Sequence, residues 1–233
     1  MYLPTFNPIP MARFSRIDVV LTMARTGMVP VFYHLDADVC KRVIEACYNG
    51  GVRVFEFTNR GDFAHELFAE LNRFAATHFP EMIMGAGTVA DAGTAALYMQ
   101  LGANFIVAPF LKEDVALTCN RRKIAWVPGC ATLTEISRAE ELGAEIVKVF
   151  PGNVLGPAFV AGIAGPMPWT RVMVTGGVEP KPENLKAWFN AGVTCVGMGS
   201  QLFSKELLAK GQFDALERRI KAVMEVIPTF QKP

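Results

Sequence analysis

The sequence predicts an α/β fold in the form of a single (β/α)8 barrel, also called a TIM barrel. Eight short apolar runs of strand length recur roughly every 20 to 30 residues, and segments with helical apolar spacing separate them. Four of these runs follow a glycine phrase of the kind that ends a helix in the left-handed conformation. An open doubly wound sheet is the alternative, and it is weakened because no Gly-x-Gly-x-x-Gly motif follows the first strand.

The strands and helix ends can be assigned in order along the chain. The glycine phrases are Gly50-Gly51-Val52, Gly102-Ala103-Asn104, Gly143-Ala144-Glu145 and Gly192-Val193-Thr194. The strands that follow them begin at Arg53, Phe105, Ile146 and Cys195, and the four other strands span 28–33, 83–88, 125–130 and 172–177. Eight parallel strands that alternate with helices are expected to close into one ring.

The two ends of the chain add elements outside this repeat. Residues 1–14 are expected to form an extension, residues 15–26 an extra helix that covers the N-terminal end of the barrel, and residues 214–226 a closing helix. The whole chain, 1–233, is predicted to be one domain, because 233 residues with 51% hydrophobic composition suffice for one large core.

Composition argues against several classes of function. The net charge is +1 without acidic or basic blocks, so neither nucleic acid nor a membrane surface is expected as a partner. No segment resembles a signal peptide or has the roughly 18 apolar residues of a membrane span, so a cytoplasmic protein that binds a small molecule is predicted. The cysteines are odd in number and widely spaced, which indicates reduced thiols: Cys40, Cys47, Cys119, Cys130 and Cys195.

Lys148 lies inside an apolar run, 146–151, that is predicted to be a buried strand. An ammonium group is costly to bury without a partner. Loss of its proton leaves a nucleophilic amine that attacks carbonyl groups and forms Schiff bases. The alternative is that the ammonium group reaches solvent at the end of the strand or pairs with a carboxylate.

Polar side chains gather at the predicted carboxyl ends of the strands, where barrels of this kind bind their substrates. They are Glu56, Thr58, Arg60, Thr88, Lys148, Thr175 and Ser200. Strand alternation predicts that three sets of side chains point into the barrel: Val54, Glu56 and Thr58; Met84, Ala86 and Thr88; Ile146, Lys148 and Phe150.

This cluster suits Schiff-base chemistry. A lysine amine adds to a ketone and gives an iminium ion whose positive nitrogen accepts electrons when the adjacent C–C bond breaks. Glu56 is the predicted acid or base for the proton transfers. Arg60 offers a planar fork for a substrate carboxylate, and Thr88 adds a hydroxyl group. The alternative is a structural ion pair between Glu56 and Lys148, with Arg60 in solvent.

Two glycine-rich segments follow the last two predicted strands, where barrels commonly bind phosphate. They are Thr175-Gly176-Gly177 and Gly197-Met198-Gly199-Ser200, and their backbone N–H groups are not covered by large side chains. A phosphorylated ligand is therefore predicted. The alternative is that these glycines serve only tight turns.

Seven short segments, in this order and spacing, resemble one known family: 51–60 (GVRVFEFTNR), 85–89 (GAGTV), Ala108-Pro109, Val127-Pro128-Gly129, 148–151 (KVFP), Thr175-Gly176-Gly177 and Gly199-Ser200. Over residues 17–205 the chain is similar to the class I 2-keto-3-deoxy-6-phosphogluconate (KDPG) aldolase and 4-hydroxy-2-oxoglutarate aldolase family. The resemblance implies a metal-independent barrel without a cofactor, often a homotrimer. Such enzymes cleave a 2-keto-4-hydroxy acid to pyruvate and an aldehyde such as glyceraldehyde 3-phosphate or glyoxylate.

The resemblance also implies a role for each matching residue. Lys148 would form the Schiff base, Glu56 would act as general acid and base, and Arg60 and Thr88 would hold the pyruvate carboxylate. Phe150 would pack against the pyruvyl group, with Pro109 and Thr175 in the same substrate site. The phosphate ligands implied are Gly176, Gly177, Gly199 and Ser200.

The chain departs from the family pattern at four places, one of which is Asn59 in place of a common leucine. Phe110 replaces a glycine and is expected at the mouth of the pocket, Gly152-Asn153 replaces Ala-Glu, and the 177–182 loop is longer than usual. A sugar-phosphate epimerase or isomerase, or a non-catalytic sugar-phosphate-binding protein, would share the glycine segments without needing the lysine. The scattered histidines, His34, His65 and His78, predict no metal site.

Overall fold

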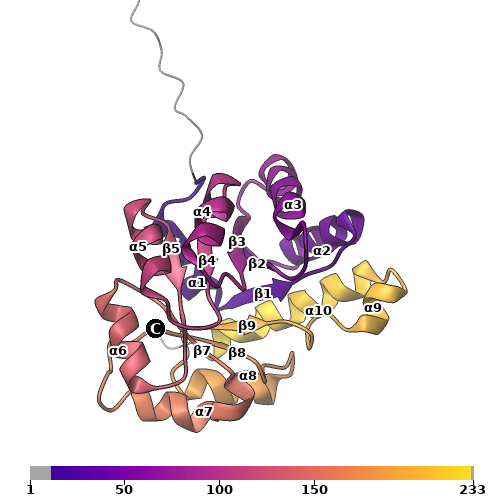
Figure 1. The fold of residues 1–233 in the computed structure, drawn as a ribbon. Helices are drawn as coiled ribbons and strands as arrows, with labels where there is room; N and C mark the ends of the chain where they lie inside the picture. Colours follow the sequence, from indigo (N-terminus) through magenta and orange to yellow (C-terminus); the bar gives the residue numbers. More distant parts are fainter. Residues whose placement is uncertain (1–11, 232–233) are drawn as a thin grey trace, which may run out of the picture.

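The chain forms a nearly closed parallel β-barrel surrounded by helices (Figure 1), in a computed structural model that describes residues 12–231. The strands are β1 (Met28–Phe32), β2 (Val54–Thr58), β3 (Ile83–Gly87), β4 (Phe105–Val107), β5 (Ala125–Val127), β6 (Gly129–Cys130), β7 (Val147–Val149), β8 (Val172–Thr175) and β9 (Cys195–Met198). Their order around the sheet is β5-β4-β3-β2-β1-β9-β8-β7-β6. Each of the eight predicted segments contains a strand.

The predicted strand 125–130 is divided at Pro128 into β5 and β6. Proline has no N–H group and cannot donate to a strand ladder, which explains the interruption. β5 pairs with β4 and β6 pairs with β7, so the two edges of the sheet meet within one short segment. The carbonyl of Pro128 still accepts a hydrogen bond from the Lys148 N–H at 2.8 Å. An open doubly wound sheet would separate these edges, so the structure favours the barrel.

The helices other than α1 lie outside the ring of strands (Figure 1). The helices are α1 (Arg16–Thr26), α2 (Ala37–Asn49), α3 (Ala64–His78), α4 (Ala92–Gln100), α5 (Glu113–Arg121), α6 (Leu133–Glu141), α7 (Gly152–Ile163), α8 (Pro182–Asn190), α9 (Lys205–Ala209), α10 (Phe213–Val226) and the 3-10 turn η1 (Ile227–Thr229). α10 packs against α2, which brings the last long helix beside the first repeat. Within residues 12–231, no helix is long and apolar enough to cross a membrane.

Glycine ends four of these helices in the way that the sequence predicts. Gly51, Gly102, Gly143 and Gly192 have φ values of 101°, 91°, 86° and 100°. In this region of conformational space a side chain would clash with the backbone, so glycine is preferred. The chain can therefore turn sharply from each helix into the next strand.

Strand alternation separates an inner cluster of side chains from an outer cluster under the helices. Val54 and Ile146 belong to the inner cluster, so Glu56 and Lys148, two residues further along their strands, also face the interior. The flanking residues of Lys148, Val147 and Val149, pack in the outer cluster. The sequence therefore predicts the orientation of these two strands correctly.

The predicted orientation of β3 is wrong. Met84 and Ala86 pack in the outer cluster, whereas Ile83 lies in the inner one. The inward positions are glycines, Gly85 and Gly87, and a Cβ atom at either would overlap a neighbouring inward side chain. Met84 and Ala86 thus face the helices, and the inner face at Gly85 and Gly87 is left free for larger groups from adjacent strands.

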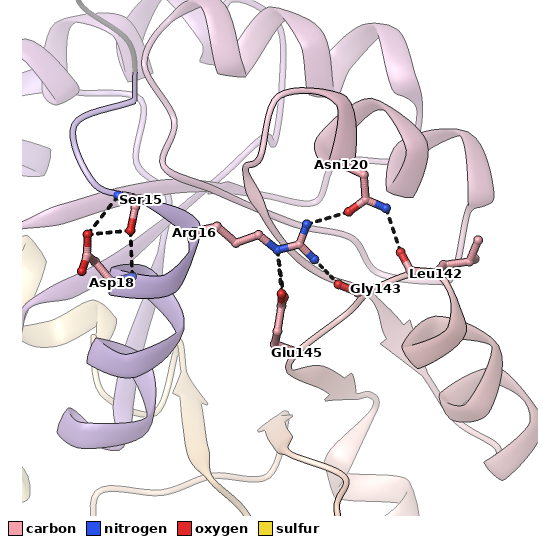
Figure 2. Close-up of polar contacts among 7 residues, drawn as sticks. All are labelled: Ser15, Arg16, Asp18, Asn120, Leu142, Gly143 and Glu145. Atoms are coloured by element: carbon pink, nitrogen blue, oxygen red, sulfur yellow. Dashed lines mark hydrogen bonds and ion pairs between the residues drawn. The ribbon is translucent and has the colours of Figure 1, made fainter.

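Helix α1 contacts the inner cluster, where Val19 and Met23 are fully buried with the strand side chains. Its Arg16 binds three groups, one on α5 and two in the segment that follows α6 (Figure 2). The guanidinium group donates to Asn120 Oδ1 at 2.6 Å and to the carbonyl oxygen of Gly143, and it pairs with Glu145 at 2.8 Å. Of the predicted extension 1–14, residues 1–11 lie outside the described residues.

Candidate active site

A cavity of about 650 Å³ opens at the carboxyl ends of the strands. Of the predicted site residues, it is lined by Arg60, Phe150, Thr175, Gly176, Gly177, Gly199 and Ser200. Four predicted residues are not among its lining residues: Glu56, Thr88, Pro109 and Lys148. Within residues 12–231, no aspartate or glutamate side chain lines the cavity, so its electrostatic potential favours anions.

Lys148 is the central residue of β7 and its side chain is only 6% exposed. Its Nζ atom lies 5.1 Å from the centre of the Phe150 ring, and Phe150 lines the cavity. No described residue forms an ion pair or a side-chain hydrogen bond with Lys148 in the range 12–231. A carboxylate partner therefore does not explain this lysine.

Glu56 lies on β2 and is fully buried, and neither carboxylate oxygen has a hydrogen-bond partner among the described residues. Burial raises the pKa of Glu56, and the positive charges of Lys148 and Arg60 oppose part of this rise. The space for the carboxylate exists because residue 87 is glycine: a Cβ atom there would overlap Glu56 Oε1. The proposed structural ion pair with Lys148 is absent from residues 12–231, so the simple ion-pair interpretation is not supported.

Thr88 follows β3 with φ of 59°, in the left-handed region that threonine rarely adopts. Its neighbour Gly87 accepts a hydrogen bond from the N–H of Asn59 at 2.8 Å, which connects the end of β3 to the segment that carries Arg60. A β-branched residue in this conformation is strained, and such strain occurs often at functional sites. Arg60 itself is exposed and forms no ion pair with any residue in 12–231.

Pro109 and Phe110 follow β4. The Pro109 carbonyl oxygen occupies the position where a Cβ atom of Gly129 would lie, so these two segments are in close contact. Phe110 is 44% exposed and does not belong to the residues that line the cavity. The expectation that Phe110 lies at the mouth of the pocket stays a prediction, because Glu56 and Lys148 are absent from the same lining.

The glycine segments after β8 and β9 present free backbone donors to the cavity. In the described part of the chain, no acceptor is found for the N–H groups of Gly176, Gly177, Gly199 and Ser200. The Gly177 carbonyl oxygen is turned away, because it accepts hydrogen bonds from Asn184 Nδ2 at 3.1 Å and from Trp188 Nε1 at 3.4 Å. Successive free N–H groups form a concave site suited to an anion.

The small residue at the start of α7 belongs to the same arrangement. A Cβ atom at Gly152 would lie 2.5 Å from the carbonyl oxygen of Gly176, so a larger residue would displace the glycine segment. Asn153 packs on Gly177 and lines the cavity. The close approach of α7 to this loop thus explains the glycine at position 152.

The cavity also contains residues that were not predicted. They include Tyr33 and His34 after β1, Asn153 at the start of α7, and Gln201, Phe203 and Lys205 after β9. The sequence could have indicated these residues, because they follow strands β1, β7 and β9 and the loops after the strands of a barrel form its active site. His34 Nδ1 accepts a hydrogen bond from the Asp36 N–H at 3.0 Å, so the other ring nitrogen carries the proton of the neutral ring.

This fold and site define a barrel enzyme in which a buried lysine has no ion-pair partner within residues 12–231 and a buried carboxyl group faces the same interior. Comparison with known proteins narrows the class. The sequence model described as "Aldolase: KDPG and KHG aldolase" matches residues 17–219, and the chain belongs to this family.

Individual relatives agree with this assignment. The chain is 30% identical over 200 residues to the KHG/KDPG aldolase of Escherichia coli (strain K12), covering 85% of this chain and 91% of the relative. It is 32% identical over 214 residues to the 2-dehydro-3-deoxy-phosphogluconate aldolase of Pseudomonas aeruginosa, covering 91% and 93%. The structure of the KDPG aldolase of Zymomonas mobilis ZM4 with 3-phosphoglycerate superimposes with a TM-score of 0.75 at 27% identity, covering 91% of this chain and 97% of that chain.

Proposed function

We propose that this protein is a class I aldolase that reversibly cleaves a 2-keto-4-hydroxy acid to pyruvate and an aldehyde. The observation that carries the proposal is Lys148, an inward-facing lysine that is 6% exposed and lies beside the cavity-lining Phe150. A lysine that only stabilised the fold would be expected to have a carboxylate or carbonyl partner. Membership of the family supports the same assignment.

Lys148 Nζ, in its neutral form, adds to the C2 keto carbon of the substrate, and loss of water gives an iminium ion. A base then removes the proton of the C4 hydroxyl group. The C3–C4 bond breaks, its electron pair moves toward the iminium nitrogen, and the aldehyde leaves while an enamine stays on Lys148. Protonation at C3 and addition of water release pyruvate and the free amine.

Glu56 performs these proton transfers, either directly or through a water molecule. Because burial raises its pKa, the carboxyl group keeps its proton to a higher pH than an exposed glutamate, which suits a group that must both donate and accept protons. The positive charges of Lys148 and Arg60 favour the ionised form of the same carboxyl group. Proton transfer at Glu56 and Schiff-base formation at Lys148 are therefore electrostatically coupled.

Arg60 and Thr88 bind the substrate carboxylate, and Phe150 packs against the pyruvyl group, with Pro109 nearby. Arg60 suits this role because its planar guanidinium group binds a carboxylate through two parallel hydrogen bonds and has no partner among residues 12–231. Phe150 connects the buried Lys148 to the cavity. The keto acid thus enters with its carboxylate toward Arg60 and its carbonyl carbon toward Lys148.

The other end of the substrate carries a phosphate, bound by the glycine segments. Support comes from the four free N–H groups of Gly176, Gly177, Gly199 and Ser200 and from Thr175, whose buried hydroxyl oxygen has no partner in the described part of the chain. The Zymomonas mobilis relative has a structure with 3-phosphoglycerate. We therefore assign KDPG as substrate, with glyceraldehyde 3-phosphate as the aldehyde. 4-Hydroxy-2-oxoglutarate, which yields glyoxylate, is a second substrate of the same chemistry.

The proposal extends to the organisation of the protein. The chain 1–233 is a single (β/α)8 domain in which α1 covers the N-terminal end, as supported by the burial of Val19 and Met23 among strand side chains. The protein acts without a metal or cofactor, as a homotrimer in the cytoplasm, in line with the family resemblance. The family match does not favour a sugar-phosphate epimerase or a non-catalytic binding protein.

Borohydride reduction in the presence of pyruvate, followed by peptide mass spectrometry, tests the chemistry. Reduction of the iminium ion is expected to leave a stable pyruvyl adduct on the peptide that contains Lys148. Lys148→Ala is expected to lose both the adduct and cleavage activity while its circular dichroism spectrum is unchanged.

Lys186→Ala is the matched control, because Lys186 is exposed on α8 and does not line the cavity. This variant should keep both the adduct and the activity. Turnover by the folded Lys148→Ala protein, or an adduct on another lysine, would exclude the proposed mechanism.

A further inference from the structure

Lys205 lines the cavity beyond the two glycine segments. It is the first residue of α9, it is exposed, and it forms no ion pair with a residue in the described range 12–231. Arg60 is the other fully charged side chain that lines this cavity within the described range, and it comes from the end of β2. The cavity therefore has two cationic side chains and, in the same range, no acidic lining residue.

The segment that carries Lys205 is held in place by buried side chains. Leu202 and Phe203 are buried, and the Phe203 ring lies 4.8 Å from the ring of Phe32 at the end of β1. Ser204 caps α9, since its Oγ accepts a hydrogen bond from the Leu207 N–H at 3.3 Å. Lys205 thus begins from an anchored position beside the cavity, although its ammonium group keeps the freedom of a long side chain.

The free N–H groups of the glycine segments are partial charges, whereas a phosphate group carries close to two negative charges at neutral pH. Neutral donors alone leave much of this charge uncompensated. Lys205, which lines the same cavity, supplies a full positive charge. Because no carboxylate competes for Lys205 within residues 12–231, its charge remains available to a ligand.

We propose that Lys205 is a specificity-determining residue, which binds the distal anionic group and makes the enzyme prefer substrates with two anionic ends. Arg60 receives the carboxylate end and Lys205 the phosphate end. This inference rests on the proposed aldolase function for its substrate, but the binding of a phosphate group at Lys205 can be tested without turnover. The short α9 helix has no part in the argument except as the support of the side chain.

The test compares the wild type with Lys205→Met and Lys205→Arg on KDPG and on its dephosphorylated counterpart. Lys205→Met is expected to raise KM for the phosphorylated substrate about three- to tenfold, the range for a charge-assisted contact at an exposed site, with kcat little changed. The dephosphorylated substrate should be affected less than twofold. Lys205→Arg should restore most of the preference, because it keeps the charge.

Lys221→Met is the matched control, since Lys221 is exposed on α10 and does not line the cavity. Salt gives a further readout: at higher ionic strength, KM for the phosphorylated substrate should rise more for the wild type than for Lys205→Met. An equal change for both substrates, or no change for either, would overturn the role of Lys205.

Calorimetric titration with inorganic phosphate separates this inference from the proposed function. Weaker phosphate binding by Lys205→Met than by Lys221→Met supports the role of Lys205, even if no pyruvate adduct forms on Lys148. Equal binding overturns it, even if the adduct forms. Loss of the adduct in the wild type affects the aldolase assignment alone.

Discussion

Replacement of Glu56 by glutamine is expected to stabilise the protein at neutral and alkaline pH while removing most of its activity. Glu56 is 0% exposed, and neither of its oxygens has a partner among residues 12–231. Glutamine has almost the same shape and fits the space above Gly87, so the substitution removes the charge without opening a cavity. Its effect on stability therefore measures the free energy of burying the carboxylate.

The magnitude follows from the surroundings of the side chain. A buried polar group without a partner costs about 1–3 kcal/mol and a charged one more, while the positive charges of Lys148 and Arg60 return part of this energy. The neutral amide of glutamine still costs free energy as a buried polar group without a partner, but the additional cost of burying a charge is removed. We expect Glu56→Gln to be more stable by about 1–2 kcal/mol at pH 8, or roughly 2–8 °C in Tm for a chain of this size.

The dependence on pH has a definite sign. The ordinary pKa of a glutamate is 4.5, and burial raises the pKa of Glu56 in the folded protein. Between these two values the folded protein keeps a proton that the unfolded chain has released. The stability of the wild type therefore falls as pH rises through this interval, and this part of its stability is full only below about pH 4.5.

Urea unfolding of both proteins between pH 4 and pH 9 measures this difference. The advantage of Glu56→Gln should be small near pH 4 and grow with pH. Glu225→Gln is the control, because Glu225 is exposed on α10, and its change should stay within about 0.5 kcal/mol. An advantage that does not depend on pH, or a less stable Glu56→Gln protein at pH 8, would refute the interpretation. Turnover should fall about 10²- to 10⁴-fold, while pyruvate still gives some borohydride-trapped adduct.

Two further substitutions test other parts of the barrel. Arg16→Met removes the contacts to Asn120, Gly143 and Glu145 and is expected to lower the free energy of unfolding by about 2–3 kcal/mol, with kcat unchanged because these contacts lie opposite the active site. Arg25→Met, on the exposed side of α1, is its control, and an equal loss of stability in both variants would contradict the prediction. Thr88→Gly relieves the left-handed backbone, so its stability should change by less than about 1 kcal/mol while kcat/KM falls at least about tenfold through loss of the hydroxyl group. Chemical denaturation and steady-state kinetics measure both effects, and a large loss of stability at unchanged activity would show that Thr88 is structural.

Much of the candidate site could be predicted from the sequence because its residues lie on the strands or directly after them. Glu56 and Lys148 were assigned to the interior by simple alternation, and apolar neighbours on the same strands pack as this requires. Alternation failed on β3, because two glycines there leave inner space to side chains from other strands. No pattern within β3 reveals this, since the groups that fill the space come from β2 and β4.

The charge of the residues that line the cavity could not be predicted from the sequence either. Lys205 and His34 are ordinary polar residues in the sequence, and they acquire a place beside Arg60 only because β1 and β9 are neighbours in the ring. Phe110 also follows a strand, β4, but it is not among the residues that line this cavity. Contacts between loops depend on the closure of the barrel and on the direction of each loop.

Local physical chemistry in the sequence determined the strands, the glycine helix ends and the placement of a lysine in an apolar strand. These follow from backbone preferences and from spacing along one segment, which require no knowledge of the rest of the chain. Tertiary structure decided that Glu56 has no partner in the described residues, that four backbone N–H groups stay free, and that the cavity has no acidic lining residue in the same range. Burial, desolvation and net charge in a cavity are sums over groups from distant segments, so only the folded barrel defines them.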